Sequence, residues 1–175
     1  MRGRRCHTAV GILLLAFASS NVAAGGDGPS ATLGAGAGIP YGMFGVNGEL
    51  EVPLGQYVSL GPTIGVGVAG PAGLGWNVGL QARFLSSQAL FRPGLSVWYG
   101  TNTLVEKVGS GWGDPEFETR TGATVGLNGR FQFGTTRIHC LDLFLLYPVT
   151  RNLDSDEYDE EGPVVKVGVG YAHRF

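Results

Sequence analysis

The sequence is poor in cysteine and in charge. It has two cysteines among 175 residues, Cys6 and Cys140. Because we expect Cys6 to be removed with an N-terminal signal peptide, Cys140 has no partner within the chain, which excludes a disulfide framework. Charged residues make up 15% of the chain, against about 25% in a typical soluble domain. This composition is unusual for a protein surrounded by water on all sides.

Long apolar runs are missing as well. After residue 24 no run approaches the roughly 20 residues that a transmembrane helix needs, although apolar types make up 43% of the chain. Glycine is abundant, with 31 residues, yet there is no strict glycine triplet, which excludes collagen. An apolar chain without helix-length apolar runs points to alternation of apolar and polar residues.

The N-terminal segment has the order of a secretory signal peptide. Three arginines within residues 1–5 precede an apolar run over 9–18, and small residues follow at 22–24. That order predicts a cleavable signal peptide over 1–24 and a single exported domain over 25–175. Removing these arginines leaves nine basic against fourteen acidic residues, a formal charge of −5, which argues against a nucleic-acid partner.

From residue 31 onward, apolar side chains recur at almost every second position, the period of a β-strand. Eight such runs follow one another. The connections after the second, fourth and sixth runs are short, whereas those after the fifth and seventh are long and polar. This asymmetry is typical of an all-β, eight-stranded antiparallel up-and-down transmembrane β-barrel with both termini in the periplasm. The predicted strands cover 31–39, 46–54, 58–68, 76–84, 91–99, 123–133, 140–147 and 165–175.

The glycines indicate which face of these strands lies inside. They share a face with nearly all the strand charges, while the other face is almost continuously aliphatic or aromatic. A narrow eight-stranded barrel has room inside only for side chains that fill it, and the same glycines on a water-facing wall would weaken every strand. We therefore expect an apolar wall facing lipid. The alternative is a soluble, periplasmic, lipocalin-like lipid-binding barrel whose apolar face lines a ligand cavity.

Aromatic side chains are expected at two levels of this wall. A register that sets Phe84 opposite Phe91 near the periplasmic end also sets Trp76 opposite Tyr99 near the outer end. Aromatic girdles at both lipid–water boundaries are typical of outer-membrane barrels. We therefore predict that these four residues belong to the two girdles.

The last predicted strand carries the sharpest motif. Apolar residues alternate up to a final aromatic residue, at Val165, Val167, Val169, Tyr171 and Phe175. This run resembles the C-terminal signal of small outer-membrane barrels of the OmpA-transmembrane-domain, OmpX and opacity-protein type, and the resemblance covers roughly residues 30–175. It implies recognition by the barrel-assembly machinery. His173 departs from the pattern, which usually has an apolar residue there, and an ordinary edge strand is the alternative.

Eight charged side chains point inward by the same alternation. Because buried charges have to be paired, we predict an internal ionic network rather than a clear pore. A short turn between the sixth and seventh strands makes Asp142 the direct or diagonal partner of Arg130, and Glu51 is the nearest counter-charge for the arginines at the periplasmic mouth. The eight residues are Glu49, Glu51, Arg83, Arg92, Arg130, Asp142, Lys166 and Arg174.

No catalytic pair can be built from the sequence. The palmitoyltransferase and lipid A deacylase barrels, which are of similar size, carry a His with a nearby Ser. Here His139 and His173 both lie near the periplasmic ends of their strands, and no serine stands two places from His139. Because a nucleophile needs a base within hydrogen-bond reach, we expect no catalysis and no cofactor.

The acidic segment 154–161 does not predict a dedicated metal site. It fails the EF-hand template, because Asp159 occupies the position that needs glycine and Tyr158 replaces a ligand. We expect a solvated loop. Loose cation bridging to lipopolysaccharide phosphate is the alternative for these residues.

The expected function follows from location more than from chemistry, since fold alone does not specify function. We expect a non-catalytic integral outer-membrane protein, in contact with outer-membrane lipid and lipopolysaccharide, with a structural or surface-interaction role through its two long outer loops. The alternatives are a narrow or gated, porin-like channel with Glu49, Glu51 and Arg130 as its plug, and a lipid-modifying enzyme. The sequence does not identify the partner of the loops.

Overall fold

The computed structural model describes residues 28–106, 117–150 and 165–175 of the chain. Two predicted features, the signal peptide over 1–24 and the acidic segment 154–161, lie outside these residues. Among the residues described, no helix is long and apolar enough to cross a membrane.

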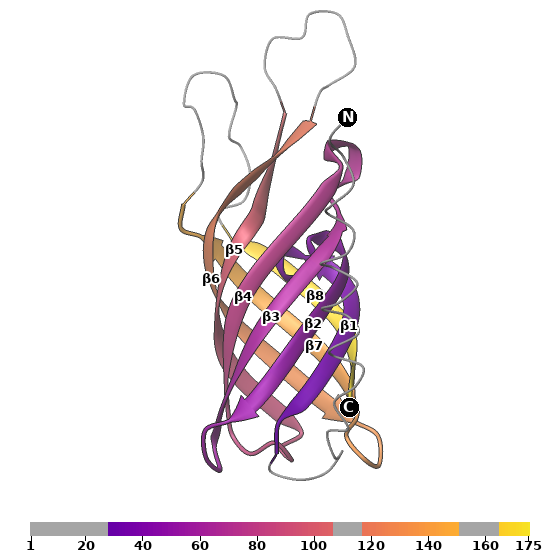
Figure 1. The fold of residues 1–175 in the computed structure, drawn as a ribbon, viewed down its shortest axis with the longest axis vertical. Coiled ribbons are helices and arrows are strands. Elements are labelled where there is room, and N and C mark those ends of the chain that lie inside the picture. The colour runs from indigo at the N-terminus through magenta and orange to yellow at the C-terminus, as the bar shows by residue number, and fades with distance from the viewer. Residues whose placement is uncertain (1–27, 107–116, 151–164) are drawn as a thin grey trace, which may run out of the picture.

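Eight antiparallel strands form a closed barrel (Figure 1). Each strand pairs with the next, and the last strand pairs with the first, so that the predicted all-β, eight-stranded antiparallel barrel is confirmed. The strands are β1 (Ser30–Gly38), β2 (Met43–Pro53), β3 (Val58–Val68), β4 (Leu74–Phe84), β5 (Phe91–Glu106), β6 (Phe117–Phe133), β7 (His139–Pro148) and β8 (Lys166–Arg174).

The two ends of the barrel differ in their connections. The connections 54–57, 85–90 and 134–138 lie together at one end, at the bottom of Figure 1. We call this the turn end, and the opposite end, where β5 leads into β6 and β7 into β8, the loop end. A short 3-10 helix, η2 (Gly70–Ala72), joins β3 to β4 at the loop end.

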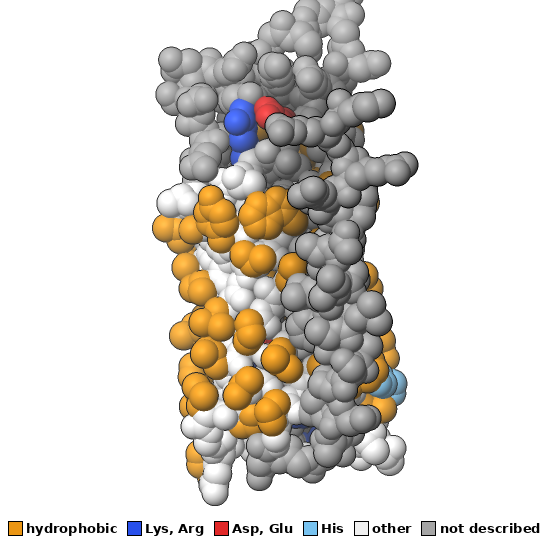
Figure 2. Space-filling model, viewed as in Figure 1, with side chains coloured by type: hydrophobic (Ala, Val, Ile, Leu, Met, Phe, Trp, Pro, Cys, Tyr) orange, Lys and Arg blue, Asp and Glu red, His pale blue; other side chains and the backbone are white. Residues whose placement is uncertain are grey.

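Alternation separates an apolar outer wall from a buried interior. In β7 the side chains of Leu141, Leu143 and Leu145 are exposed on the wall, whereas Asp142 and Phe144 between them are buried. Apolar side chains cover the part of the wall that is visible in Figure 2. The faces therefore have the polarity that the glycine and charge pattern predicted.

The connection between β1 and β2 folds into the barrel. A 3-10 helix, η1 (Ile39–Tyr41), occupies it, and the side chains of Ile39 and Tyr41 are buried. We had expected Ile39 to be the last outward residue of the first strand, and that expectation was wrong. The reason is local: Gly38 has a φ of 114° and Gly42 a φ of 60°, conformations that glycine adopts without strain, so the chain turns inward and back.

The register between β4 and β5 differs from the one predicted. Arg83 pairs with Gly94, and Val78 pairs with Tyr99. Phe84 is therefore not opposite Phe91, and Trp76 is not opposite Tyr99. Pro93 has no N–H to donate, and in the observed register it falls just beyond the last residue of β5 that pairs with β4. The shift is two residues, so every side chain keeps its face.

The β5–β6 hairpin is longer than predicted. Residues 117–120, which the sequence placed in a polar insert, belong to β6, and β5 continues to Glu106. The added pairs include Thr101 with Thr121 and Leu104 with Thr119, and β-branched threonine favours strands. A bulge interrupts the register between Thr101 and Thr103.

Candidate functional site in the barrel interior

Glu49 on β2 lies at the centre of an ionic layer inside the barrel. Its carboxylate accepts hydrogen bonds from Arg83 on β4, through Nη1 and, at 2.8 Å, Nη2. The same carboxylate accepts a bond of 2.9 Å from Nη2 of Arg130 on β6. All three side chains are at most 2% exposed. One carboxylate therefore connects two strands that are not its neighbours in the barrel.

Arg130 continues this layer to the opposite side of the barrel. It lies directly opposite Asp142 in the β6–β7 ladder. Its Nε and Nη2 donate to the two oxygens of Asp142 at 2.6 and 2.7 Å, the two-pronged geometry that favours an Arg–carboxylate pair. Nη1 donates to Thr32 on β1 at 3.3 Å. The pair predicted between Arg130 and Asp142 is confirmed.

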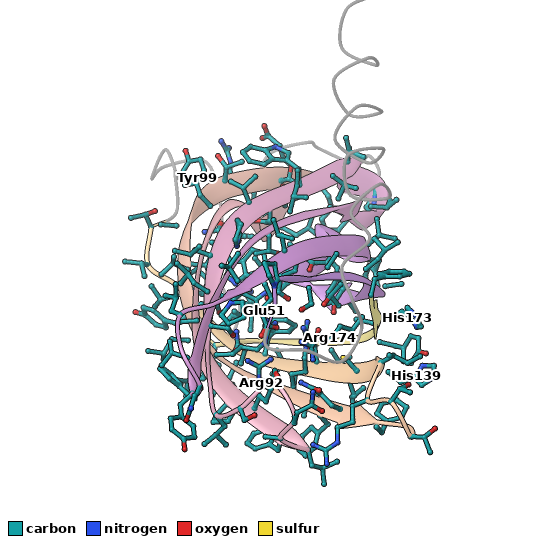
Figure 3. All side chains as sticks on the ribbon, turned by 60° about the horizontal axis from the view of Figure 1, so that its bottom comes forward. Glu51, Arg92, Tyr99, His139, His173 and Arg174 are labelled. Carbon is teal, nitrogen blue, oxygen red and sulfur yellow. The ribbon has the colours of Figure 1, made fainter. Side chains whose placement is uncertain are left out.

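A second carboxylate, Glu51, lies nearer the turn end. It accepts a hydrogen bond of 2.6 Å from Arg92, whose other terminal nitrogen donates to Ser59 at 2.8 Å. Arg83 and Arg130 also lie within 3.6 and 3.8 Å of Glu51. Figure 3, which brings the turn end forward, labels Glu51 and Arg92. Six of the predicted inward charges thus form one connected network of paired ions.

The other two predicted members lie elsewhere. Arg174 is half-buried at the turn end and donates to Ser30 Oγ at 3.0 Å and to the Ser87 carbonyl at 3.2 Å. Lys166 is half-buried at the other end of β8, opposite Leu146. The hydrogen bonds of Arg174 correct our expectation that Glu51 would be its counter-charge: a serine and a backbone carbonyl at the mouth satisfy it.

An apolar layer, which the alternation of residues did not predict, fills the interior nearer the loop end. Tyr41 of η1 packs edge-on against Phe144, with ring centroids 6.2 Å apart, and Trp98 packs against the same ring at 6.3 Å. These rings form one buried cluster with Ile39 and Leu146. The cluster and the ionic layer lie one after the other along the barrel.

Inward-facing glycines make the room that η1 occupies. A methyl group added at Gly36 or Gly170 would overlap the ring of Tyr41, and one added at Gly65 would overlap the carbonyl of Pro40. Two asparagines on the inner wall hold the η1 backbone. Asn47 Nδ2 donates to the Pro40 carbonyl at 2.9 Å, and Asn77 Nδ2 donates to the Ile39 carbonyl at 2.7 Å. This cluster of inward glycines was the available sequence signal for a loop inside the barrel.

A small hollow lies at the turn end, between the ionic layer and the turns. It is lined in part by Glu51, Ser59, Ser87 and Arg92, and its volume is about 10 Å³. That is about the volume that one water molecule needs, whereas small-molecule sites occupy roughly 300–1,000 Å³. The hollow therefore suits a water molecule beside the Glu51–Arg92 pair and not an organic ligand.

The predicted wall residues lie on the outer face. Trp76 contacts Tyr99 diagonally, with ring centroids 6.3 Å apart, while Phe91 packs on Phe131 of β6 at 4.6 Å. Phe84 is exposed near the turn end. The side chains of the proposed assembly signal, Val167, Val169, Tyr171 and Phe175, are exposed too. Their recognition by an assembly machinery stays a prediction.

His139 and His173 lie outside the barrel and away from the interior network (Figure 3). His139 Nδ1 is 2.6 Å from the phenol oxygen of Tyr171. The described part of the chain holds no group of three or more His, Cys, Asp or Glu side chains that could bind a metal ion.

No protein-family model matches the chain, and no curated protein matches it. Among solved structures, the fold is similar to the N-terminal β-barrel domain of Pseudomonas aeruginosa OprF. The sequences are 16% identical, the TM-score is 0.47, and the match covers 84% of this chain and 96% of that one.

Proposed function

We propose that the chain is an integral outer-membrane β-barrel protein with a closed interior and no catalytic activity. In this proposal the turn end faces the periplasm and the loop end faces outward. The outer wall is the observation that carries it. Exposed valine, leucine and aromatic side chains run along the strands on every side of the barrel, and monomeric proteins in water rarely expose apolar patches larger than a few hundred Å².

The interior supports a membrane barrel over the lipocalin-like alternative. A soluble lipid-binding barrel would line its inside with apolar side chains around a cavity. Here the middle of the inside is occupied by paired charges, with Arg83, Arg92 and Arg130 among the largest fully buried side chains. Paired charges inside and apolar side chains outside are the arrangement that lipid on the outside favours.

Two layers in series support a closed barrel rather than a channel. An ion that entered from the turn end would first meet the network of Glu49, Arg83 and Arg130 and then the packed rings of Tyr41 and Phe144. Opening would require breaking buried ion pairs as well as moving η1, and each such pair is costly to break. We therefore propose a non-conducting resting state.

We further propose a structural or surface-interaction role through the loop end. The β5–β6 hairpin extends beyond its neighbour: β4 pairs with β5 only as far as Gly100, whereas β5 continues to Glu106. Outer-membrane lipid, lipopolysaccharide and the barrel-assembly machinery are the expected partners.

We propose that the chain has no catalytic activity because the side chain hydrogen-bonded to the His139 ring is the phenol of Tyr171. The lipid-modifying barrels have a serine near their histidine instead.

The first test is to fractionate cells that express the chain and to compare unboiled with boiled samples by SDS gel electrophoresis. We expect recovery in the outer-membrane fraction and faster migration of the unboiled band, because a closed barrel resists SDS until it is heated. Recovery in the soluble periplasmic fraction would overturn the proposal.

Planar-bilayer recording of the purified protein then tests whether the barrel is closed. We expect no steady conductance, and stable unitary openings would favour the channel instead.

A further inference from the structure

The connection between β4 and β5, residues 85–90, contacts the far side of the barrel at the turn end. In the ring of eight strands this connection lies opposite the seam between β8 and β1. Arg174 of β8, which Figure 3 shows within the ring of strands, nevertheless donates through Nη1 to the backbone carbonyl of Ser87 at 3.2 Å. Two segments from opposite sides of the ring are therefore in direct contact.

The size of the barrel shows that the connection folds inward. Eight strands about 4.8 Å apart, tilted by about 35–45°, form a ring roughly 16 Å across, which is wider than the reach of one arginine side chain. The backbone of Ser87 therefore has to lie over the mouth and not above its own wall. Ser87 also lines the hollow at the turn end together with Glu51 and Ser59 of β2 and β3, as expected for a segment that crosses the mouth.

The two ends of this connection differ. At its C-terminal end, the carbonyl of Leu90 accepts a hydrogen bond of 2.7 Å from the N–H of Gln132, which continues the β5–β6 ladder. At its N-terminal end, Leu85 has a φ of 73°, a left-handed conformation that residues other than glycine rarely adopt. Such a conformation persists only when surrounding contacts enforce it. The contact with Arg174 is in a position to do so.

Arg174 is not part of the ionic network and is available for this contact. Its Nε donates to Ser30 Oγ on β1 at 3.0 Å, and its Nη1 donates to the Ser87 carbonyl, whereas the three buried carboxylates of the network are paired with other arginines. Hydrogen bonds from a charged donor are stronger than those between neutral groups. The Ser87 hydroxyl is buried and has no hydrogen-bond partner among the described residues, so the backbone carbonyl and not the side chain holds this residue.

We propose that residues 85–89 form a cap over the mouth at the turn end and that Arg174 is the latch that holds the cap to the β8–β1 seam. Release of the latch leaves the cap attached through Leu90 and uncovers Glu51 and Arg92, which line the hollow beneath it. Because Arg174 lies on β8, the latch closes only when β8 has paired with β1. The proposal rests on the geometry of the turn end and not on the proposed function of the barrel.

The test measures how fast a thiol in the cap reacts with a water-soluble maleimide. It uses the full chain, folded in detergent micelles, with Cys6→Ala, Cys140→Ala and Ser87→Cys, so that one thiol remains. Because Ser87 Oγ is buried, we expect a slow reaction while the cap is latched. Adding Arg174→Gln is expected to speed the reaction by about 10-fold, the effect on an opening equilibrium of losing a hydrogen bond to a charged group. A fast reaction with Arg174 intact would overturn the cap, and an unchanged rate in the Arg174→Gln variant would overturn the latch.

The matched control is Arg137→Gln, which removes the same charge from the neighbouring connection between β6 and β7. We expect the thiol to stay protected in this variant. An equal acceleration would mean that positive charge at the turn end, rather than the contact with Ser87, protects the thiol, and the latch would be wrong. Faster migration of the unboiled band shows that each variant is folded.

The dependence of the rate on urea separates release of the cap from loosening of the whole barrel. Local opening exposes little surface, so in the Arg174→Gln variant we expect a rate that is nearly independent of urea below the unfolding transition. A rate that rises with urea as steeply as global unfolding does would contradict the latch, because Arg174 would then act only on the stability of the entire barrel.

Discussion

At the scale of single residues, the interior depends on Glu49. This carboxylate accepts hydrogen bonds from Arg83 and Arg130 and is fully buried. Removing one partner of a buried ion pair leaves an uncompensated charge, which costs more than the pair itself contributes. Loss of Glu49 would leave two guanidinium groups partly unpaired, with Glu51 and Asp142 as the remaining carboxylates nearby.

Glu49→Gln is therefore predicted to destabilise the folded barrel strongly. We expect a loss of about 3–5 kcal/mol in the free energy of unfolding, the range for breaking a buried pair by removing one partner. Urea unfolding in detergent micelles or lipid vesicles, followed by tryptophan fluorescence, measures it.

The matched control is Glu118→Gln in the β5–β6 hairpin. Glu118 lies 3.3 Å from Arg120 and its side chain is 52% exposed, so the same chemical change there costs about 0–1 kcal/mol. Equal losses in the two variants would mean that the ionic layer contributes no more than a surface pair.

The sequence predicted some of these pairings and not others, for a geometric reason. Arg130 and Asp142 lie on consecutive strands joined by a short turn, so counting from the turn was enough to pair them. Glu49 and Arg83 lie on β2 and β4, which do not pair with each other. Their contact depends on how far the strands are staggered when the barrel closes, and alternation gives only the face on which a residue lies.

At the scale of elements, η1 is the part that the periodicity misread. Apolar residues alternate through Ala35, Ala37 and Ile39, and the pattern does not change where the strand ends at Gly38. Only the inward glycines of other strands, such as Gly65 and Gly170, indicate that something bulky occupies the interior. That signal can be recognised only once those strands are known to surround the same space.

Gly170→Ala is predicted to disturb η1. An added methyl group would overlap the Tyr41 ring, and overpacking a well-packed interior costs about 1–3 kcal/mol. Unfolding by urea measures this loss in the free energy of unfolding. In a Tyr41→Ala background most of the loss is expected to disappear, because the overlapping ring is gone.

Gly48→Ala is the matched control for this prediction. Gly48 faces outward with no atom within 4 Å of the added methyl group. The free energy of unfolding of this variant is therefore expected to stay within about 0.5 kcal/mol of the wild type. An equal cost of Gly170→Ala with and without Tyr41 would show that η1 does not occupy the interior as described.

At the scale of the whole molecule, two tryptophans report on the two faces of the barrel. Trp76 is 40% exposed on the outer wall, whereas Trp98 is 3% exposed in the interior. In a membrane barrel only the first of these rings contacts acyl chains. In a soluble barrel with an apolar cavity the faces would be exchanged. The pair therefore tests the orientation of the entire wall.

Quenching of tryptophan fluorescence by brominated lipids is predicted to distinguish Trp76 from Trp98. In the variant Trp98→Phe, Trp112→Phe, which retains Trp76, we expect strong quenching in vesicles of brominated phospholipid. In Trp76→Phe, Trp112→Phe, which retains Trp98, we expect little. The Trp98 indole nitrogen has no hydrogen-bond partner among the described residues, so replacing this residue by Phe breaks no polar contact with them. Strong quenching of Trp98 alone would mean that the interior and the wall are inverted.

The pairing of β1 with β8 has a consequence for how the chain folds. Ala37 and Val169 are neighbours in the barrel although almost the whole domain separates them in sequence. Contacts between such distant segments form slowly, and until they form, an assembly of seven strands presents two unpaired edges to any other chain. We therefore expect refolding to be slow and its yield to fall as the protein concentration rises, because aggregation competes with the arrival of the last strand.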